Sequence, residues 1–300
     1  MKKKTYLFAL MAMALTLGSC SDNENGIGGE TSKYITVSTS IGNMTRVATD
    51  ANGGQTFEEG DEISVYAWIG APTVAPETRE RVVNNAINKL TNGSWISNPQ
   101  MLWKNNRDKH YFIGVYPISA ISDLSAGEYA FDETKQVESD LLVAVNKDGL
   151  SYNVDEQQPV PLTFTHVMAK LVVNLTYKNQ WGGIPTVEKV VVGNAAKEAT
   201  INYLTKVVTP STTAKEDFSL PEITENTKYV SVIIPQEDVK QLTIVIGGKN
   251  FVYDNGTPFK LESGKITTVN LEVGRDEIKL GDVKITDWEN GSTFSGEALN

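Results

Sequence analysis

The stretch Leu242–Val273 reads LTIVIGGKNFVYDNGTPFKLESGKITTVNLEV, and its alternation of apolar runs with turns decides the class of fold. The turns are Gly247-Gly248, Asp254-Asn255-Gly256 and Glu262-Ser263-Gly264. Short runs rich in Val, Ile, Thr and aromatic residues between such turns are typical of β-strands. We therefore predict a meander of antiparallel strands at Leu242–Ile246, Lys249–Tyr253, Pro258–Leu261 and Ile266–Val273.

The earlier part of the chain follows the same period of two. Apolar residues alternate along Asp61–Gly70, and Asn92-Gly93 between apolar residues predicts a hairpin turn. Within Leu162–Tyr177 the apolar phase changes near His166–Lys170, which predicts a bulge or a short helical turn. No segment has the 3.6-residue period of a long helix. The sequence therefore predicts an all-β protein.

Chain length and a change of composition predict how the strands are divided. A chain of 300 residues exceeds what one compact core usually holds. The segment with the composition most typical of a linker between domains is Lys178–Pro185, KNQWGGIP, which is rich in glycine and polar residues. We therefore predict two tandem antiparallel β-sandwich domains, at residues 34–179 and 180–300.

Composition excludes several classes of function. A net charge of −10 disfavours a basic patch for nucleic acid or anionic lipid. A single cysteine excludes a disulfide framework, and two histidines leave little material for a zinc site. The cluster Glu58, Glu59, Asp61 and Glu62 lacks the spacing of a calcium loop and reads as a solvated turn. We predict no cofactor, no metal site and no enzymatic activity.

The two histidines are also predicted to be non-catalytic. His166, beside Phe164 on a strand, reads as a hydrogen-bonded structural histidine, because no nucleophile motif accompanies it. His110 ends the charged run that starts at Arg107, so we place it in a surface turn.

The first residues read as a targeting signal. Three lysines precede the apolar segment Thr5–Leu17, which is too short to span a bilayer and suits a signal peptide over residues 1–19. Leu17-Gly18-Ser19-Cys20 resembles the lipobox of bacterial lipoproteins, which implies lipidation of Cys20. The alternative is an ordinary signal peptide with an accidental cysteine. Residues 20–33 read as the lipidated cysteine and a flexible tether, and Ser21–Glu24 resembles the surface-export signal of Bacteroidetes lipoproteins.

Several motifs, in their order and spacing, resemble the fimbrillin family of Bacteroidetes, the subunits of type V pili. They are the lipobox, Ile35–Ile41 with Met44-Thr45-Arg46, Phe57–Tyr66 (FEEGDEISVY), Ser139–Ala144 (SDLLVA), Leu162–His166 (LTFTH) with Ala169-Lys170-Leu171, and Ile285–Gly291 (ITDWENG). The resemblance implies transthyretin-like sandwich domains and a structural or adhesive pilus subunit. It also implies a surface-exposed outer-membrane lipoprotein that enters the pilus, or fimbrium, after processing.

The resemblance further implies a processing step. In the family an Arg-specific surface protease cuts after the first strand, and the C-terminal strand of another subunit fills the groove by donor-strand exchange. Carried over, the cut falls between Arg46 and Val47, and the displaced strand presents Ile35, Val37, Thr39 and Ile41. The implied partners are other pilus subunits, identical or sibling, together with that protease. A host or bacterial surface ligand stays unidentified, the membrane is reached only through the lipid, and nucleic acid is not a partner.

The C-terminal segment contains a candidate donor strand. Its apolar residues are Ile278, Leu280, Val283, Ile285 and Trp288. Their alternation changes phase at Gly281, and the segment could equally be the last strand of its own sheet.

Two other functions stay open from the sequence. A monomeric surface lipoprotein that binds glycans would need exposed, coplanar aromatic residues, and the chain has five tryptophans that could provide them. Core packing is the commoner role for such residues. A surface hydrolase would need a cleft with two close carboxylates, which no motif in the sequence indicates.

Overall fold

The computed structural model describes residues 33–42, 56–152, 158–254 and 256–288. These residues are almost entirely β-strand, with two single turns of 3₁₀ helix at Thr78–Glu80 and Asn179–Trp181. The all-β prediction is confirmed. Within the described ranges no helix has the length and apolar character needed to cross a membrane.

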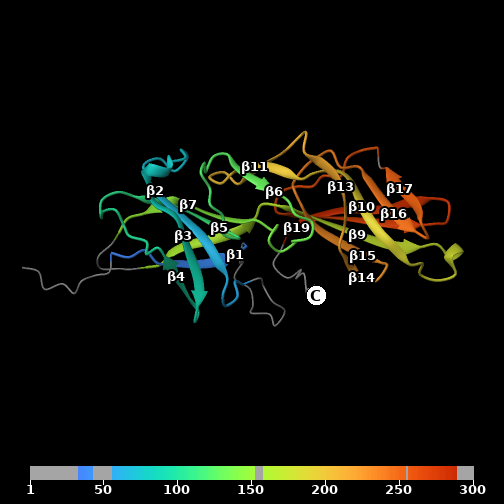
Figure 1. Ribbon diagram of the computed structural model, residues 1–300, viewed down its shortest axis with the longest axis horizontal. Coiled ribbons are helices and arrows are strands. Elements are labelled where there is room, and N and C mark those ends of the chain that lie inside the picture. The colour runs from blue at the N-terminus through green and yellow to red at the C-terminus, as the bar shows by residue number, and fades with distance from the viewer. Residues whose placement is uncertain (1–32, 43–55, 153–157, 255, 289–300) are drawn as a thin grey trace, which may run out of the picture. The chain divides into compact units, whose positions relative to one another are not determined.

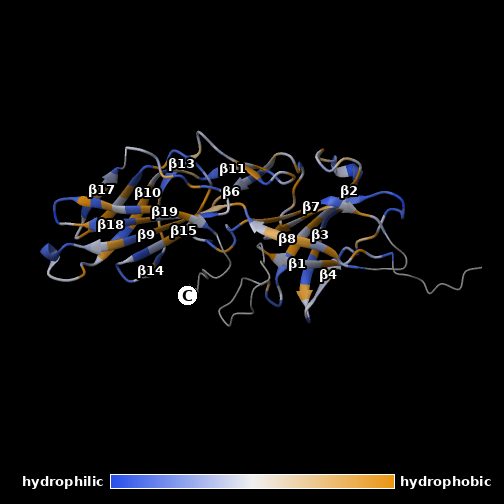
Figure 2. Cartoon of the chain, turned by 180° about the vertical axis from the view of Figure 1, so that it is seen from behind, coloured by the Kyte–Doolittle hydropathy of each residue, from blue (hydrophilic) through white to orange (hydrophobic). Residues whose placement is uncertain are grey.

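The N-terminal strands form one seven-stranded sheet in the order β1-β8-β7-β5-β2-β3-β4 (Figure 1). Their bounds are β1 Val37–Ile41, β2 Glu62–Ile69, β3 Arg81–Thr91, β4 Ser94–Asn98, β5 His110–Tyr116, β7 Leu142–Leu150 and β8 Val160–His166. The sheet curls so that its two ends meet, because Tyr34 bridges Leu102 and the Ile35 N–H donates to the Met101 carbonyl at 2.9 Å. In Figure 2, β1 accordingly lies between β8 and β4.

The inner face of this curled sheet encloses its own hydrophobic core, which we call the N-terminal core. Its fully buried members include Ile63, Val65, Phe112, Leu162 and Phe164. They lie on the three strands β2, β5 and β8, and the residues of one strand occupy alternate positions, as the period of two requires. The strand β1 belongs to this core through its inward-facing residues.

Two further sheets form most of the C-terminal part. One has four strands in the order β13-β10-β16-β17, and the other has five in the order β14-β15-β9-β18-β19. Their bounds are β9 Ala169–Tyr177, β10 Val187–Ala196, β13 Lys215–Ser219, β14 Glu222–Thr224, β15 Lys228–Ile233, β16 Gln241–Ile246, β17 Lys249–Asp254, β18 Lys265–Val273 and β19 Ile278–Asp287. A three-stranded sheet joins β6 Gly127–Ala130, β11 Glu198–Asn202 and β12 Val207–Pro210.

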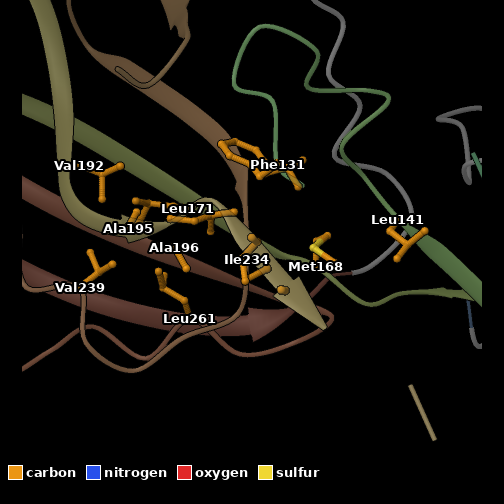
Figure 3. Packing of buried hydrophobic residues seen from close by; sticks show 14 of the residues in the cluster. Phe131, Leu141, Met168, Leu171, Val192, Ala195, Ala196, Ile234, Val239 and Leu261 are labelled. Atoms are coloured by element: carbon orange, nitrogen blue, oxygen red, sulfur yellow. The ribbon is translucent and has the colours of Figure 1, made fainter. Parts of the chain in front are cut away.

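The main hydrophobic core collects side chains from both of these larger sheets. Figure 3 shows Leu171 of β9 together with Val192, Ala195 and Ala196 of β10 and the buried Val239. Hydrophobic residues concentrate in the strands, whereas the loops are mainly polar (Figure 2). This separation is what a β-sandwich core requires.

The predicted meander at Leu242–Val273 is partly wrong. Leu242–Ile246 and Lys249–Tyr253 do form a hairpin, β16–β17. The chain then leaves that sheet, because β18 pairs with β9 and β19 instead of β17. Pro258–Leu261 is not a strand but a crossing segment. It is held by a bridge between Leu261 and Gln236 and by the Phe259 N–H, which donates to the Val239 carbonyl at 2.7 Å. Buried Phe259 and Leu261 explain why its sequence reads as strand-like.

The phase change near His166–Lys170 has a similar cause. Strand β8 ends at His166 and β9 begins at Ala169, with Val167 and Met168 buried between them. The chain passes here from the seven-stranded sheet to the five-stranded sheet, so neither a bulge nor a helical turn is present. Strand β9 precedes the predicted domain boundary in the sequence, but it pairs with β15 and β18, which follow that boundary. The division into residues 34–179 and 180–300 stays a prediction.

Candidate functional site

The first strand lies at the seam where the ends of the seven-stranded sheet meet. β1 pairs in parallel with β8, and Val37, Thr39 and Ile41 stand opposite Val160, Leu162 and Phe164. The inward-facing Ile35, Val37 and Ile41 are buried, whereas Thr36 and Ser38 are exposed. The structure thus places the first strand at a sheet edge with one apolar face.

The other side of the seam is formed by β4 and the segment after it. The Ile35 N–H donates to Met101, and the Trp103 N–H donates to the Lys33 carbonyl at 3.1 Å. Met101 is buried beneath β1 in the N-terminal core. Removing β1 would uncover the apolar walls on both sides and leave the ladder groups of β8 without partners.

A side-chain hydrogen bond crosses the seam in addition to these backbone hydrogen bonds. The Trp95 Nε1–H of β4 donates a hydrogen bond to the Thr39 hydroxyl at 3.0 Å. Phe57 fixes the indole edge-on at a centroid distance of 5.3 Å, and the same ring contacts Phe164 at 5.1 Å. Sequence reasoning missed Trp95 as a site residue. The sequence feature that could have indicated it is its position just after the Asn92-Gly93 turn, which places Trp95 on the second strand of the hairpin, β4.

Three of the predicted processing residues lie outside the described ranges. These residues are the lipidation site Cys20 and the cleavage pair Arg46 and Val47. Their roles stay predictions. The described chain stops at Gly42 and resumes at Thr56, so the predicted cut falls in the connection between β1 and β2.

The candidate donor strand is β19, the edge strand of the five-stranded sheet. It pairs with β18 along its whole length, with a register shift that leaves Gly281 unpaired between Leu280 and Asp282. The extra residue keeps Ile278, Leu280, Val283 and Ile285 on one face, the face of β18 that carries buried Leu271 and Val269. This bulge explains the phase change seen in the sequence.

The apolar face of β19 is only partly covered. Leu280, Val283 and Ile285 are 36%, 38% and 40% exposed, although they face the same way as a buried row on β18. In this structure β19 is the last strand of its own sheet. Its donation to another subunit stays a proposal.

Trp288 anchors the end of β19. Its indole stacks on His166 with a centroid distance of 4.0 Å and an interplanar angle of 5°. The backbone N–H of Trp288 donates to the Gly264 carbonyl at 3.0 Å. Asp140 lies 2.8 Å from the His166 Nδ1, and the Lys170 Nζ lies 5.1 Å from the indole centroid. Because His166 ends β8, the strand that holds β1 also contacts the end of β19.

Lys170 is the one strongly perturbed cation of this cluster. Burial lowers its pKa from 10.5 to about 8, and Asp140 acts in the opposite direction. Between these two pKa values the unfolded chain keeps a proton that the folded chain has lost, so stability rises with pH in this window.

We therefore expect the free energy of unfolding to rise by about 2 kcal/mol from pH 8 to pH 10, relative to a Lys170→Met variant. Urea unfolding of both proteins across this range measures the difference, and the comparison cancels the tyrosine titrations that the two share. A difference between the proteins that does not change with pH would contradict the assignment to Lys170.

The other histidine is not where the sequence placed it. His110 starts β5 and is fully buried, packed edge-on against Trp103 at 5.0 Å. Its Nε2 accepts from the Lys104 N–H at 3.2 Å, and its Nδ1 bonds the Asp108 carbonyl at 3.1 Å. Burial is the main cause that lowers its pKa. The surface-turn prediction is wrong because His110 is already the first residue of the buried strand β5.

The side chains of the acidic cluster at Glu58–Glu62 stabilise the turn before β2 and its neighbours. Asp61 accepts from the Glu58 N–H at 2.7 Å, Glu59 accepts from the Asn92 N–H at 2.7 Å, and Glu62 pairs with Lys89. Among the described residues no group of three or more His, Cys, Asp or Glu side chains is placed to hold a metal ion.

The tryptophans do not form a platform for sugar rings. All five lie in the described ranges, and each is buried or partly buried. They are spread over both cores, with Trp68 and Trp288 nearly inaccessible. No specific observation therefore favours the glycan-binding alternative.

Known proteins share the sequence pattern and the fold of this chain. The profile of the fimbrillin-like family matches residues 45–288. The chain belongs to the fimbrillin-like family. It is therefore grouped with fimbrial structural proteins rather than with enzymes. No curated protein matches the chain.

Solved structures share the fold at low sequence identity. One, described as a cell adhesion protein of Bacteroides ovatus, is 18% identical, with a TM-score of 0.61 over 85% of this chain and 98% of that one. A similarly described protein of Bacteroides uniformis is 17% identical, with a TM-score of 0.63 over the same shares. A fimbrial protein of Bacteroides vulgatus is 11% identical, with a TM-score of 0.54 over 84% and 99%. This fimbrillin-like chain thus has the complete fold of these proteins.

Proposed function

We propose that this fimbrillin-like protein is a pilus subunit that polymerises by donor-strand exchange. It is exported as a surface lipoprotein of the outer membrane through Cys20. A protease specific for arginine then cuts between Arg46 and Val47, which separates the lipid and β1 from the rest of the chain. A strand from another subunit replaces β1.

The observation that carries this proposal is the position of β1. It is the first strand, and it closes the seam of the seven-stranded sheet. Its side chains Val37 and Ile41 are buried in the N-terminal core together with Ile35, which lies just before it. A cut in the connection that follows would leave this strand held only by non-covalent contacts. An incoming strand can restore the same ladder bonds and fill the same apolar positions.

The arrangement of β19 supports its role as the donated strand. It lies at a sheet edge, and its apolar face is partly exposed. Its ten residues, Ile278–Asp287, are long enough to replace the five-residue β1. Donation from one subunit to the next is a head-to-tail contact, which forms a filament when it does not close on itself.

An arginine-specific protease applied to the chain from Ser21 to Asn300 tests the proposal. We expect one early cut that creates a new N-terminus at Val47, followed by oligomers that resist SDS. The matched control is Arg46→Lys, which keeps the charge but removes the cleavage site. It should stay uncut at this position and monomeric under the same conditions.

Two results would contradict the proposal. One is early cleavage at Arg79, whose side chain is highly exposed, with Arg46 left intact. The other is a complete cut after Arg46 that yields only monomers, even when sibling subunits are added.

A further inference from the structure

The groove that β1 occupies is not purely apolar. On the face that points into the N-terminal core, β1 presents Val37, Thr39 and Ile41, and Ile35 precedes them two residues before the strand. The third of these four positions is therefore polar between aliphatic neighbours. The Thr39 hydroxyl accepts the 3.0 Å hydrogen bond from the Trp95 Nε1–H. An indole N–H can only donate, so a strand without an acceptor at this position leaves it without that bond.

The orientation of Trp95 is fixed independently of β1. Phe57 packs against the indole from the connection between β1 and β2, on the far side of the predicted cut, and Leu90 of β3 pairs with Trp95 in the β3–β4 ladder. The donor would therefore still point into the seam after β1 has left. An unsatisfied polar group at such a site costs more free energy than an ordinary hydrogen bond contributes.

We propose that Trp95 selects the strand that replaces β1, by requiring a hydrogen-bond acceptor two residues after an aliphatic pair. The sequence pattern is aliphatic-x-aliphatic-x-acceptor, where the acceptor is Ser, Thr, Asn or Asp and takes the place of Thr39. The occupant is a β-strand of another pilus subunit with this pattern. The inference rests on the proposed strand exchange and specifies the partner's chemistry.

The C-terminal strand of a second copy of this chain satisfies the pattern. Val283, Ile285 and Asp287 have the spacing of Ile35, Val37 and Thr39 when the strand runs in the direction of β1. Asp287 is exposed in its present position, where it pairs with Lys265. The carboxylate of Asp287 would accept from the indole N–H in the groove as a charge-assisted bond.

The first test uses the uncut chain and needs no strand exchange. Thr39→Val removes the acceptor at constant shape, whereas Thr39→Ser keeps it. We expect the equilibrium constant of unfolding to be about five- to twenty-fold larger for Thr39→Val than for Thr39→Ser, because only the valine variant loses the hydrogen bond. This difference should disappear in a Trp95→Phe background. Equal effects of the two substitutions, or a difference that persists without the indole, would overturn the inference.

The second test measures strand selection itself. The chain is cut by the arginine-specific protease in the presence of fluorescent peptides of residues 33–43, KYITVSTSIGN, and their uptake into the protein is followed by anisotropy. The wild-type and Thr39→Ser peptides should bind about five- to twenty-fold more tightly than the Thr39→Val peptide. The Trp95→Phe protein should bind all of them alike.

The outcomes separate the two proposals. Uptake of every peptide with equal affinity would overturn the role of Trp95 and leave strand exchange standing. Uptake of none, with the cut fragment still bound, would overturn strand exchange and the selection that rests on it.

Discussion

The substitution Phe164→Ala is expected to lower the free energy of unfolding by about 3–5 kcal/mol. Phe164 is fully buried on β8, stands opposite Ile41 of β1, and contacts Phe57 edge-on at 5.1 Å. Its ring also covers Gly114, where an added Cβ would lie only 2.6 Å from the Phe164 Cζ. Truncation would therefore leave a cavity between β8 and β5, next to the groove that β1 occupies.

Urea unfolding followed by tryptophan fluorescence measures this loss. Phe164→Leu is the matched control, because it retains most of the buried volume and should cost clearly less than the alanine variant. Gly114→Ala tests the same contact from the other side, since it overfills the site instead of emptying it. Wild-type stability of Phe164→Ala would show that this ring does not pack in the N-terminal core as described.

The substitution Trp288→Ala is expected to release the end of β19, with a local cost of about 2–4 kcal/mol. The indole is nearly buried, stacks on His166 at 4.0 Å, and lies beneath the Lys170 ammonium. The neighbouring β19 side chains are at least one-third exposed, so little else holds this end of the strand to the main core. Hydrogen exchange of the β19 amides should therefore accelerate far more than that of β9.

Trp288→Phe controls for loss of the ring, since it preserves stacking on His166. In the cleaved protein, Trp288→Ala should also form oligomers faster than Trp288→Phe, because β19 must leave its own sheet before it can be donated. Unchanged exchange in β19 after Trp288→Ala would mean that the ladder with β18 alone secures this strand, contrary to the expectation.

The alternation of apolar residues determined the class of fold and the faces of the strands. Ile63, Val65 and the β16–β17 hairpin follow from a period of two and from glycine turns, which are local properties of the sequence. The first strand was predicted from the resemblance to the fimbrillin family, and the structure buries Ile35, Val37 and Ile41 on one face of it. Local patterns are sufficient here because a residue's side of a strand depends only on its position along that strand.

The choice of neighbouring strands was decided only by the tertiary structure. The sequence predicted that β17 and β18 belong to one meander, but they lie in different sheets. His110 was predicted to lie in a polar turn, yet backbone groups satisfy both of its nitrogens inside the protein. Neither result has a local signal, because a strand's partner and a side chain's burial depend on what the rest of the chain brings beside it.

The candidate site shows the same division. The sequence by itself determined which residues of the first and last strands are apolar. The tertiary structure decided that Thr39 meets Trp95 and that His166 meets Trp288, through contacts between segments far apart in the chain. The physical reason is that periodicity sets the direction of a side chain, whereas closure of the curled sheet and packing of the sandwich set what it touches.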